Sequence, residues 1–233
     1  KMAMIFQEPM TSLNPAYSIG NQLMEAMLRH KKISRGEARD RAVELLQKVG
    51  ITDAENRLRQ FPHQLSGGLR QRVMIAMSLM CGPDLIIADE PTTALDVTIQ
   101  AQILSLLKEL QDDLGMGLLL ITHDMGVVAR MADRVAVMYA GRIVEEGTVH
   151  QVFDNPTHPY TKGLMSCIPV PGKVKRGDPL GTIPGIVPSL VGDFNGCRFR
   201  SRCPFSVDIC AIEEPVLIHT DLEKRHSSAC HIG

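Results

Sequence analysis

Short apolar runs alternate with amphipathic stretches over the first 150 residues of the chain. Residues 1–6, 85–88 and 118–122 are apolar runs of strand length, and residues between them show helical periodicity. This alternation predicts an α/β domain whose buried strands form a parallel sheet, because helices cross over between successive strands. Two further runs, 135–139 and 142–145, flank Ala140-Gly141 and predict a β-hairpin.

Helix boundaries are marked by capping residues. The stretch 34–49 opens with Ser34 and has Glu37 three positions later, which is the pattern of a capping box. Two more helices are expected over about 67–80 and over 97–114. Together with the strands, these helices predict that residues 1–150 form one domain, with a helical subdomain at about 8–80.

The composition changes after position 150. Nine of the fourteen prolines and five of the six cysteines fall in 151–233, and 172–191 is rich in Gly and Pro. We expect 151–233 to be an extension that runs partly as extended chain and ends in a small cysteine-stapled knot. A metal or cluster would stabilise such a segment, because it cannot bury much core.

The overall composition excludes several classes of protein. Hydrophobic residues make up 44%, enough for a sizeable core, and 25 basic residues balance 26 acidic ones. This balance argues against a nucleic-acid-binding protein, which is usually basic. No apolar stretch reaches the length of a membrane span, and no secretory signal opens the chain. We therefore expect any association with a membrane to go through a partner.

A glycine pair opens the helix expected at 67–80. Ser66, Gly67 and Gly68 would place free backbone N–H groups, a hydroxyl and a positive helix end where an anion could bind. Taken alone, the same residues are more typical of an ordinary N-cap followed by a turn. The motif indicates an anion-binding site only in combination with the other motifs along the chain.

Polar side chains follow three of the expected strands. Asp89 and Glu90 end the run at 85–88, His123 follows the run at 118–122, and Gln7 follows the first run. Ligands of parallel sheets bind at the carboxyl edge, where these groups would meet. Asp89 is suited to Mg2+ and Glu90 to polarising an attacking water. Each residue alone could equally be a surface or loop residue.

The joint order of these motifs resembles the ATP-binding-cassette (ABC) ATPases, and the resemblance covers residues 1–150. It implies a P-loop NTPase fold, ATP and Mg2+ as substrate and cofactor, and Glu90 and His123 as catalytic residues. The remaining motif residues that it implies for nucleotide binding are Gln7, Ser66, Gly67, Gly68, Gln71, Asp89 and Asp96.

Two segments narrow the resemblance. The run Ile5 to Pro15 and the run Thr157 to Thr161 are similar to those of the dipeptide and oligopeptide importers, a branch that includes nickel importers. The resemblance implies a second ATPase subunit, identical or paralogous, in a head-to-tail dimer. It also implies two transmembrane permease subunits, an extracellular or periplasmic binding protein, and a peripheral location on the cytoplasmic face of the inner membrane.

One family element does not appear. The phosphate loop Gly-x-x-x-x-Gly-Lys-Ser/Thr (Walker A) is missing, and Gly172-Lys173 is no substitute because valine follows and the upstream glycine is lacking. We expect this element in a part of the subunit that precedes Lys1. A soluble ABC protein and a degenerate regulatory cassette are the alternatives, and the retained Glu90 and His123 count against the second.

Four cysteines form a set in the extension. Cys197, Cys203, Cys210 and Cys230 are spaced C-x5-C-x6-C-x19-C, wider than zinc-finger hairpins. Four thiolates suit either a [4Fe–4S] cluster or tetrahedral Zn2+, and the spacing does not choose between them. Some peptide-importer ATPases carry an iron–sulfur cluster in this extension, so the resemblance places the cluster before Zn2+ and free thiols last.

Overall fold

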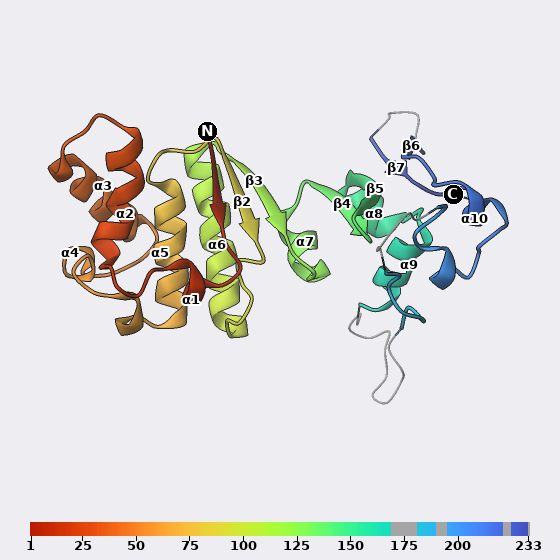
Figure 1. Cartoon of the computed structure of the whole chain (residues 1–233), viewed down its shortest axis with the longest axis horizontal. Helices are drawn as coiled ribbons and strands as arrows, with labels where there is room; N and C mark the ends of the chain where they lie inside the picture. The colour runs from red at the N-terminus through yellow and green to blue at the C-terminus, as the bar shows by residue number, and fades with distance from the viewer. Residues whose placement is uncertain (169–180, 190–194, 221–224, 233) are drawn as a thin grey trace. The chain divides into compact units, whose positions relative to one another are not determined.

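A computed structural model describes residues 1–168, 181–189, 195–220 and 225–232 (Figure 1). Contacts within the chain divide it into two compact units, Lys1–His123 and Asp124–Gly233. Each unit contains its own sheet, a three-stranded one in the first and a four-stranded one in the second. The segment 172–191, expected to be extended, is described only at 181–189, where it has no regular secondary structure.

The first unit is built on a parallel sheet of order β1-β2-β3, which confirms the predicted fold class for this region. Its strands are β1 (Met2–Ile5), β2 (Leu85–Asp89) and β3 (Gly117–Ile121). The long helix α6 (Val97–Leu114) crosses over between β2 and β3. All three strands therefore end at one edge of the sheet, and the last pair in register at that edge is Asp89 and Ile121.

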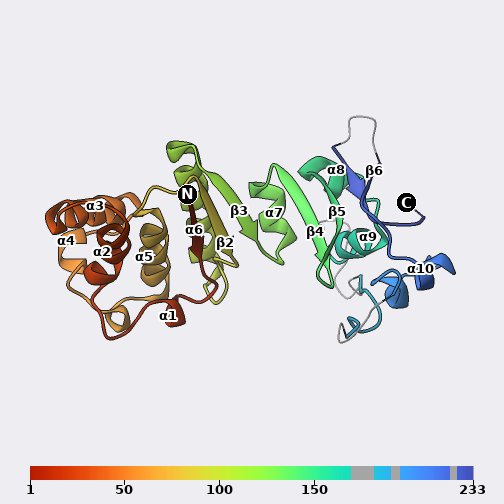
Figure 2. The ribbon, with the colours of Figure 1, turned by 45° about the horizontal axis from the view of Figure 1, so that its top comes forward.

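A helical region lies between β1 and β2 in the sequence. Its members are α1 (Pro9–Ser12), α2 (Ile19–His30), α3 (Arg35–Lys48), α4 (Ala54–Arg57), the 3-10 helix η1 (Pro62–Gln64) and α5 (Gly67–Leu79). Helix α5 packs against β1 and α6 as well as against α2 and α3, and so joins the sheet to the helical region (Figures 1 and 2). The predicted capping box of α3 is confirmed, since the Ser34 N–H donates to Glu37 Oε2 at 2.7 Å.

The two faces of the parallel sheet differ in burial. Ile5, Ile86 and Ala88 are at most 1% exposed, whereas Leu119 and Ile121 are 51% and 44% exposed on the opposite face. The expectation that residues 118–122 form a buried strand is therefore wrong, because Leu118 and Leu120 of β3 are only partly buried and Leu119 and Ile121 are exposed. Side chains of a strand point to opposite faces in turn, and only one face packs against the helices.

The second unit begins with α7 (Met125–Met131) and contains an antiparallel sheet of order β4-β5-β7-β6. The predicted hairpin is confirmed as β4 (Arg134–Tyr139) and β5 (Arg142–Thr148). Ala140 and Gly141 join the strands with φ of 47° and 79°, as a type I′ turn requires. The other elements of this unit are α8 (Val149–Asp154), α9 (Pro159–Ser166), the 3-10 helix η2 (Arg200–Arg202), α10 (Ile209–Ile212), β6 (Ile218–His219) and β7 (Ser227–Ser228).

Contacts within the chain place the boundary between the two compact units at His123, whereas the composition changes at position 150. The predicted division into domains at position 150 stays a prediction. Strand β5 pairs with β4 on one side and with β7 on the other. The hairpin therefore shares a sheet with the chain's last strand, although its composition resembles that of the preceding residues. Backbone pairing with a distant segment, which local composition does not reveal, places the hairpin in the second compact unit.

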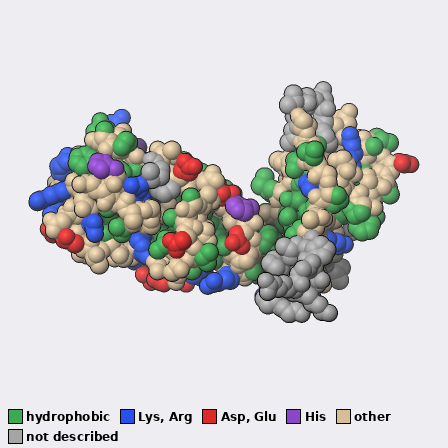
Figure 3. Space-filling view, turned by 90° about the horizontal axis from the view of Figure 1, so that it is seen from below, with side chains coloured by type: hydrophobic (Ala, Val, Ile, Leu, Met, Phe, Trp, Pro, Cys, Tyr) green, Lys and Arg blue, Asp and Glu red, His purple; other side chains and the backbone are tan. Residues whose placement is uncertain are grey.

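An aromatic cluster holds the second unit together. Tyr139 from the hairpin, Tyr160 from α9 and Phe199 from the cysteine-bearing segment have ring centroids 4.7 to 5.4 Å apart. Such pairs stabilise a small core beyond the area that they bury. Hydrophobic side chains also remain on the surface of this unit (Figure 3), among them Ile212 and Val216.

Among the described residues, no helix has the length and the apolar character that crossing a membrane requires.

Candidate active site

Glu90 stands at the carboxyl edge of the parallel sheet, where β2 ends. Its backbone N–H donates to the Ile121 carbonyl at 2.9 Å, which extends the pairing of β2 with β3 by one residue. Its φ of 42° lies in the left-handed region, which costs a residue with a side chain about 1 kcal/mol. The chain turns sharply here, and the carboxylate is left at the sheet edge with 24% of the side chain exposed.

Three side chains converge on the Glu90 carboxylate. Gln7 Nε2 donates to Oε2 at 2.7 Å, and Thr93 Oγ1 donates to the same oxygen at 2.8 Å. His123 Nδ1 lies 3.0 Å from Oε1. Gln7 follows β1 and His123 follows β3, so the neighbouring strands of Glu90 deliver both. The structure thus brings together three of the residues singled out in the sequence, and adds Thr93, to which sequence reasoning assigned no role.

These contacts keep Glu90 ionised. The hydrogen bond from His123 and then that from Thr93 lower the pKa of Glu90 below its ordinary value, against a smaller opposing contribution from burial. An ionised carboxylate can accept a proton at neutral pH. Its two oxygens also differ, because Oε2 accepts two hydrogen bonds while Oε1 faces the histidine ring alone.

Asp89, the preceding residue, closes β2. It is in register with Ile121 on the less buried face of the sheet, and its side chain is partly exposed. Carboxylate oxygens are the ligands that Mg2+ prefers, and Mg2+ usually keeps several of its waters. Asp89 therefore offers oxygen ligands of the kind that Mg2+ prefers, one residue before Glu90 at the same edge of the sheet.

Ser66 begins helix α5, as predicted, and the glycines that follow it differ from one another. Ser66 Oγ accepts a long hydrogen bond of 3.4 Å from the Leu69 N–H. A Cβ on Gly68 would stand 3.0 Å from Ile99 Cγ2, so the missing side chain at this position serves packing against α6. A Cβ on Gly67 would make only an ordinary 3.8 Å contact with Leu95. Packing therefore explains the glycine at position 68. It does not explain the glycine at position 67, where the close approach of a ligand is the better explanation.

Two other residues expected to bind nucleotide have local structural roles. Gln71 is 1% exposed on the inner side of α5, and its Nε2 has no hydrogen-bond partner among the described residues. Its side chain is not available to a ligand in this structure, because it is buried about one turn into α5. Asp96 is exposed and caps α6, where its Oδ1 accepts from the Ile99 N–H at 3.0 Å.

The four cysteines of the extension lie within electrostatic reach of one another. Burial, above all, raises the pKa of Cys197, and the nearby Cys210, Cys203 and Cys230 thiols raise it further. Burial likewise raises the pKa of Cys203, to which Cys230 and Cys210 add. The Cys197 N–H donates to the Cys210 carbonyl at 2.8 Å. Within the described part of the chain, however, no three His, Cys, Asp or Glu side chains are close enough to share one metal ion.

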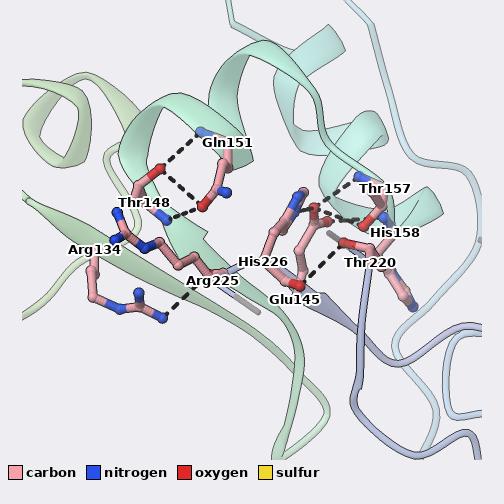
Figure 4. A network of polar contacts seen from close by, with 9 residues as sticks. All are labelled: Arg134, Glu145, Thr148, Gln151, Thr157, His158, Thr220, Arg225 and His226. Carbon is pink, nitrogen blue, oxygen red and sulfur yellow. Dashed lines mark hydrogen bonds and ion pairs between the residues drawn. The ribbon is translucent and has the colours of Figure 1, made fainter. Parts of the chain in front are cut away.

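Sequence reasoning missed a buried carboxylate on β5. The Glu145 side chain is fully buried and accepts hydrogen bonds from the N–H groups of Thr157 and His158 at 2.8 and 2.9 Å (Figure 4). The Thr157 hydroxyl contributes another at 3.0 Å, and His226 Nε2 lies 2.7 Å away. Glu146 follows it in the same strand, and the two glutamates cannot be told apart by their local sequence. The run Thr157 to Tyr160, already singled out in the sequence, was the one available signal, because its first two residues donate the hydrogen bonds to Glu145.

Comparisons with known proteins identify the relatives of this chain. The family described as "ABC transporter" matches residues 1–93, and the family described as "Oligopeptide/dipeptide transporter, C-terminal region" matches residues 144–210. An ATP-binding protein for peptide import of Brucella melitensis is 56% identical over 98% of this chain and 68% of its own length. The dipeptide transport ATP-binding protein DppD of Escherichia coli is 51% identical over 99% of this chain and 69% of its own length.

Solved structures show the same fold. The cbiO1 protein of Clostridium perfringens, part of the ABC transporter complex cbiONQ, is 32% identical with a TM-score of 0.58, over 66% of this chain and 59% of that one. The ATP-binding cassette MJ0796, in a dimeric post-hydrolysis state bound to ADP and Pi, is 30% identical with a TM-score of 0.56, over 64% and 63%. The parallel sheet, the smaller antiparallel sheet, the residues gathered at Glu90 and these likenesses have one explanation: the chain belongs to the ATP-binding subunits of peptide-importing ABC transporters.

Proposed function

We propose that this chain couples ATP hydrolysis to the uptake of dipeptides or oligopeptides across a membrane. The observation that carries the proposal is the convergence of Gln7, Thr93 and His123 on the Glu90 carboxylate. ATP hydrolysis needs a water positioned in line with the terminal phosphate, and catalysis is mostly positioning and charge stabilisation. An ionised carboxylate held by neutral and histidine donors at a sheet edge is suited to that task.

The residues at the sheet edge have distinct roles in this proposal. Glu90 polarises the attacking water and accepts its proton, and His123 contacts the terminal phosphate. The Gln7 amide contacts the metal and the phosphate, and so couples their presence to the segment that follows it. Asp89 fits Mg2+, because its carboxylate forms no ion pair with a described residue and presents hard oxygen donors. When bound, Mg2+ neutralises developing charge on the phosphates.

The start of α5 serves a second nucleotide. Ser66, Gly67 and Gly68 bind the terminal phosphate of ATP held mainly by a partner ATPase subunit, so that ATP closes a head-to-tail dimer. Support comes from the exposed helix end and from Gly67, whose missing side chain the packing does not require. Asp96 begins α6 directly after Leu95, whose side chain would lie 3.8 Å from a Cβ on Gly67, and it contributes to that interface. Gln71 supports α5 from inside.

The proposal includes the importer's other components. Two transmembrane permease subunits hold the ATPase subunits against the cytoplasmic face of the membrane, and a binding protein outside delivers the peptide. The segment 8–30, directly after Gln7, contacts the permeases. The likeness to peptide-import proteins along nearly the whole chain supports this assignment.

The direct test is reconstitution of the intact subunit with its partner ATPase and permeases in liposomes. We expect ATP hydrolysis to rise when peptide-loaded binding protein is added, and labelled dipeptide to accumulate only when this subunit is present. Nickel is supplied in a parallel reaction. Uptake of nickel without peptide would replace the peptide assignment, and hydrolysis indifferent to the permeases would indicate a non-transporter ABC protein.

The proposal also places a [4Fe–4S] cluster on Cys197, Cys203, Cys210 and Cys230, in preference to Zn2+. Besides burial, Cys203, Cys210 and Cys230 all contribute to raising the pKa of the Cys197 thiol, so the four sulfurs lie near one another. Four thiolates suit a four-iron cluster, in which each binds a different iron, and the resemblance to peptide-importer ATPases, some of which carry such a cluster, favours it over Zn2+. The N–H groups of Phe199 and Phe205 also hydrogen-bond the Cys197 and Cys203 sulfurs, contacts that stabilise thiolates.

Metal analysis tests the cluster. We expect protein purified without oxygen to be brown and to contain about four iron and four acid-labile sulfide per chain. Replacing Cys210 by Ser should abolish the colour, whereas the matched variant Cys167→Ser, outside the set, should retain it. Stoichiometric zinc with no iron would show that the tetrahedral alternative is correct.

A further inference from the structure

We propose that Thr93 is a positioning residue for ATP hydrolysis, because its hydroxyl holds one oxygen of the Glu90 carboxylate and leaves the other to face the attacking water. This inference rests on the proposed function, in which Glu90 accepts the proton of that water. It assigns a role to a residue three positions after Glu90 that neither the sequence motifs nor the comparisons assign.

Thr93 contacts Glu90 twice. Its backbone N–H donates to the Glu90 carbonyl at 3.1 Å, which closes a tight turn through Pro91. Its Oγ1 donates to Glu90 Oε2 at 2.8 Å. The same turn is fixed from α6, because Gln100 Nε2 donates to the Thr92 carbonyl at 3.1 Å. The turn therefore holds the Thr93 backbone beside Glu90, within reach of the carboxylate for the hydroxyl.

The other two donors to Glu90 are differently placed. Gln7 and His123 come from distant points of the chain, and the His123 side chain is 80% exposed. In the proposed function both side chains contact the bound nucleotide: His123 contacts the phosphate, and Gln7 the metal and the phosphate. Thr93 is partly buried and belongs to the turn of Glu90 itself. It can hold the carboxylate in every state of the cycle, including states in which Gln7 and His123 bind elsewhere.

The hydroxyl affects catalysis because the contacts of the carboxylate are divided between its two oxygens. Thr93 and Gln7 donate to Oε2, whereas Oε1 faces only His123. In the reaction an O–H bond of water breaks and its proton passes to Oε1, while the water oxygen bonds to the terminal phosphorus. The bond from that phosphorus to the bridging oxygen breaks, and its electron pair leaves with ADP. A carboxylate free to rotate would present Oε1 to the water only part of the time.

Thr93→Val tests the hydroxyl, since it retains the branched shape and the backbone N–H. In the assembled transporter we expect kcat for ATP hydrolysis to fall about ten- to a hundredfold, the value of one hydrogen bond to a charged group, with KM for ATP changed less than about threefold. Thr93→Ser should restore kcat to within about threefold. The matched control is Thr92→Val, whose hydroxyl has no described partner in the same turn, and it should behave as wild type.

A double-mutant cycle separates this inference from the proposed function. In a Glu90→Gln background, Thr93→Val should cause no further loss of kcat, because the two residues act through one group. Wild-type kcat in Thr93→Val, or equal losses in the Val and Ser variants, would overturn the role of the hydroxyl. Full activity in Glu90→Gln alone would instead reject the proposed proton acceptor. Thr93→Ala supplies a second hydroxyl-free variant if the Val variant fails to assemble.

Discussion

Glu90→Gln is expected to lower kcat for ATP hydrolysis in the assembled transporter by roughly a hundred- to ten-thousandfold, the usual contribution of a general base. Glutamine has nearly the same shape as glutamate and can still accept hydrogen bonds, but it cannot accept a proton from water. ATP binding should persist, so the variant should accumulate as an ATP-bound closed dimer. Steady-state hydrolysis and size-exclusion chromatography with ATP measure the two effects.

The control for this variant is Glu109→Gln. Glu109 is an exposed residue of α6 in the same unit, and its carboxylate accepts only a local hydrogen bond from Ser105. The same chemical change at that position should leave kcat unaltered. Unchanged hydrolysis in Glu90→Gln would show that another group accepts the proton, and loss of ATP binding in that variant would show a structural role instead.

The second large effect is expected from Glu145→Gln, which should lower the free energy of unfolding by about 3 kcal/mol. Glu145 is fully buried and pairs with His226 at 2.7 Å while accepting from the backbone N–H groups of Thr157 and His158. Glutamine removes the charge and turns an amide NH2 toward groups that are themselves donors. Urea unfolding followed by circular dichroism measures the loss.

Glu146→Gln is the matched control, because Glu146 is the next residue of β5, is only partly buried and has no described side-chain partner. It should change the free energy of unfolding by less than about 0.5 kcal/mol. Equal effects of the two substitutions would show that the network around Glu145 does not stabilise the fold.

The pH dependence of this effect follows from the charge of Glu145. Burial raises its pKa, but the donors around the carboxylate, among them the Thr157 and His158 N–H groups and the His226 ring, together outweigh burial and hold the pKa below the ordinary 4.5. The unfolded chain therefore takes up this proton at a higher pH than the folded chain. The stabilisation is fully present above the ordinary pKa and is lost as the pH falls through the folded value, so the variant should be less sensitive to acid.

Local features of this protein are determined by its sequence. Ser34 with Glu37, and Asp96 before α6, define helix starts through contacts spanning only three residues, and both are present. The apolar runs define the strands, and the type I′ turn at Ala140-Gly141 defines the hairpin. Because all strands of a parallel sheet end at one edge, the meeting of Gln7, Glu90 and His123 could also be predicted, although Glu90 is 83 positions from Gln7 and 33 from His123.

Only the tertiary structure decided which groups within those elements face a neighbour. Gln71 stands in a predicted helix, yet packing turns it inward, and Gly68 is small because Ile99 lies against it. Glu145 is buried because partners 12 and 81 residues away enclose it, and its neighbour Glu146 has the same chemistry without them. Periodicity fixes the face on which a side chain lies, but its burial depends on which distant segment covers that face, and such pairings leave no local pattern.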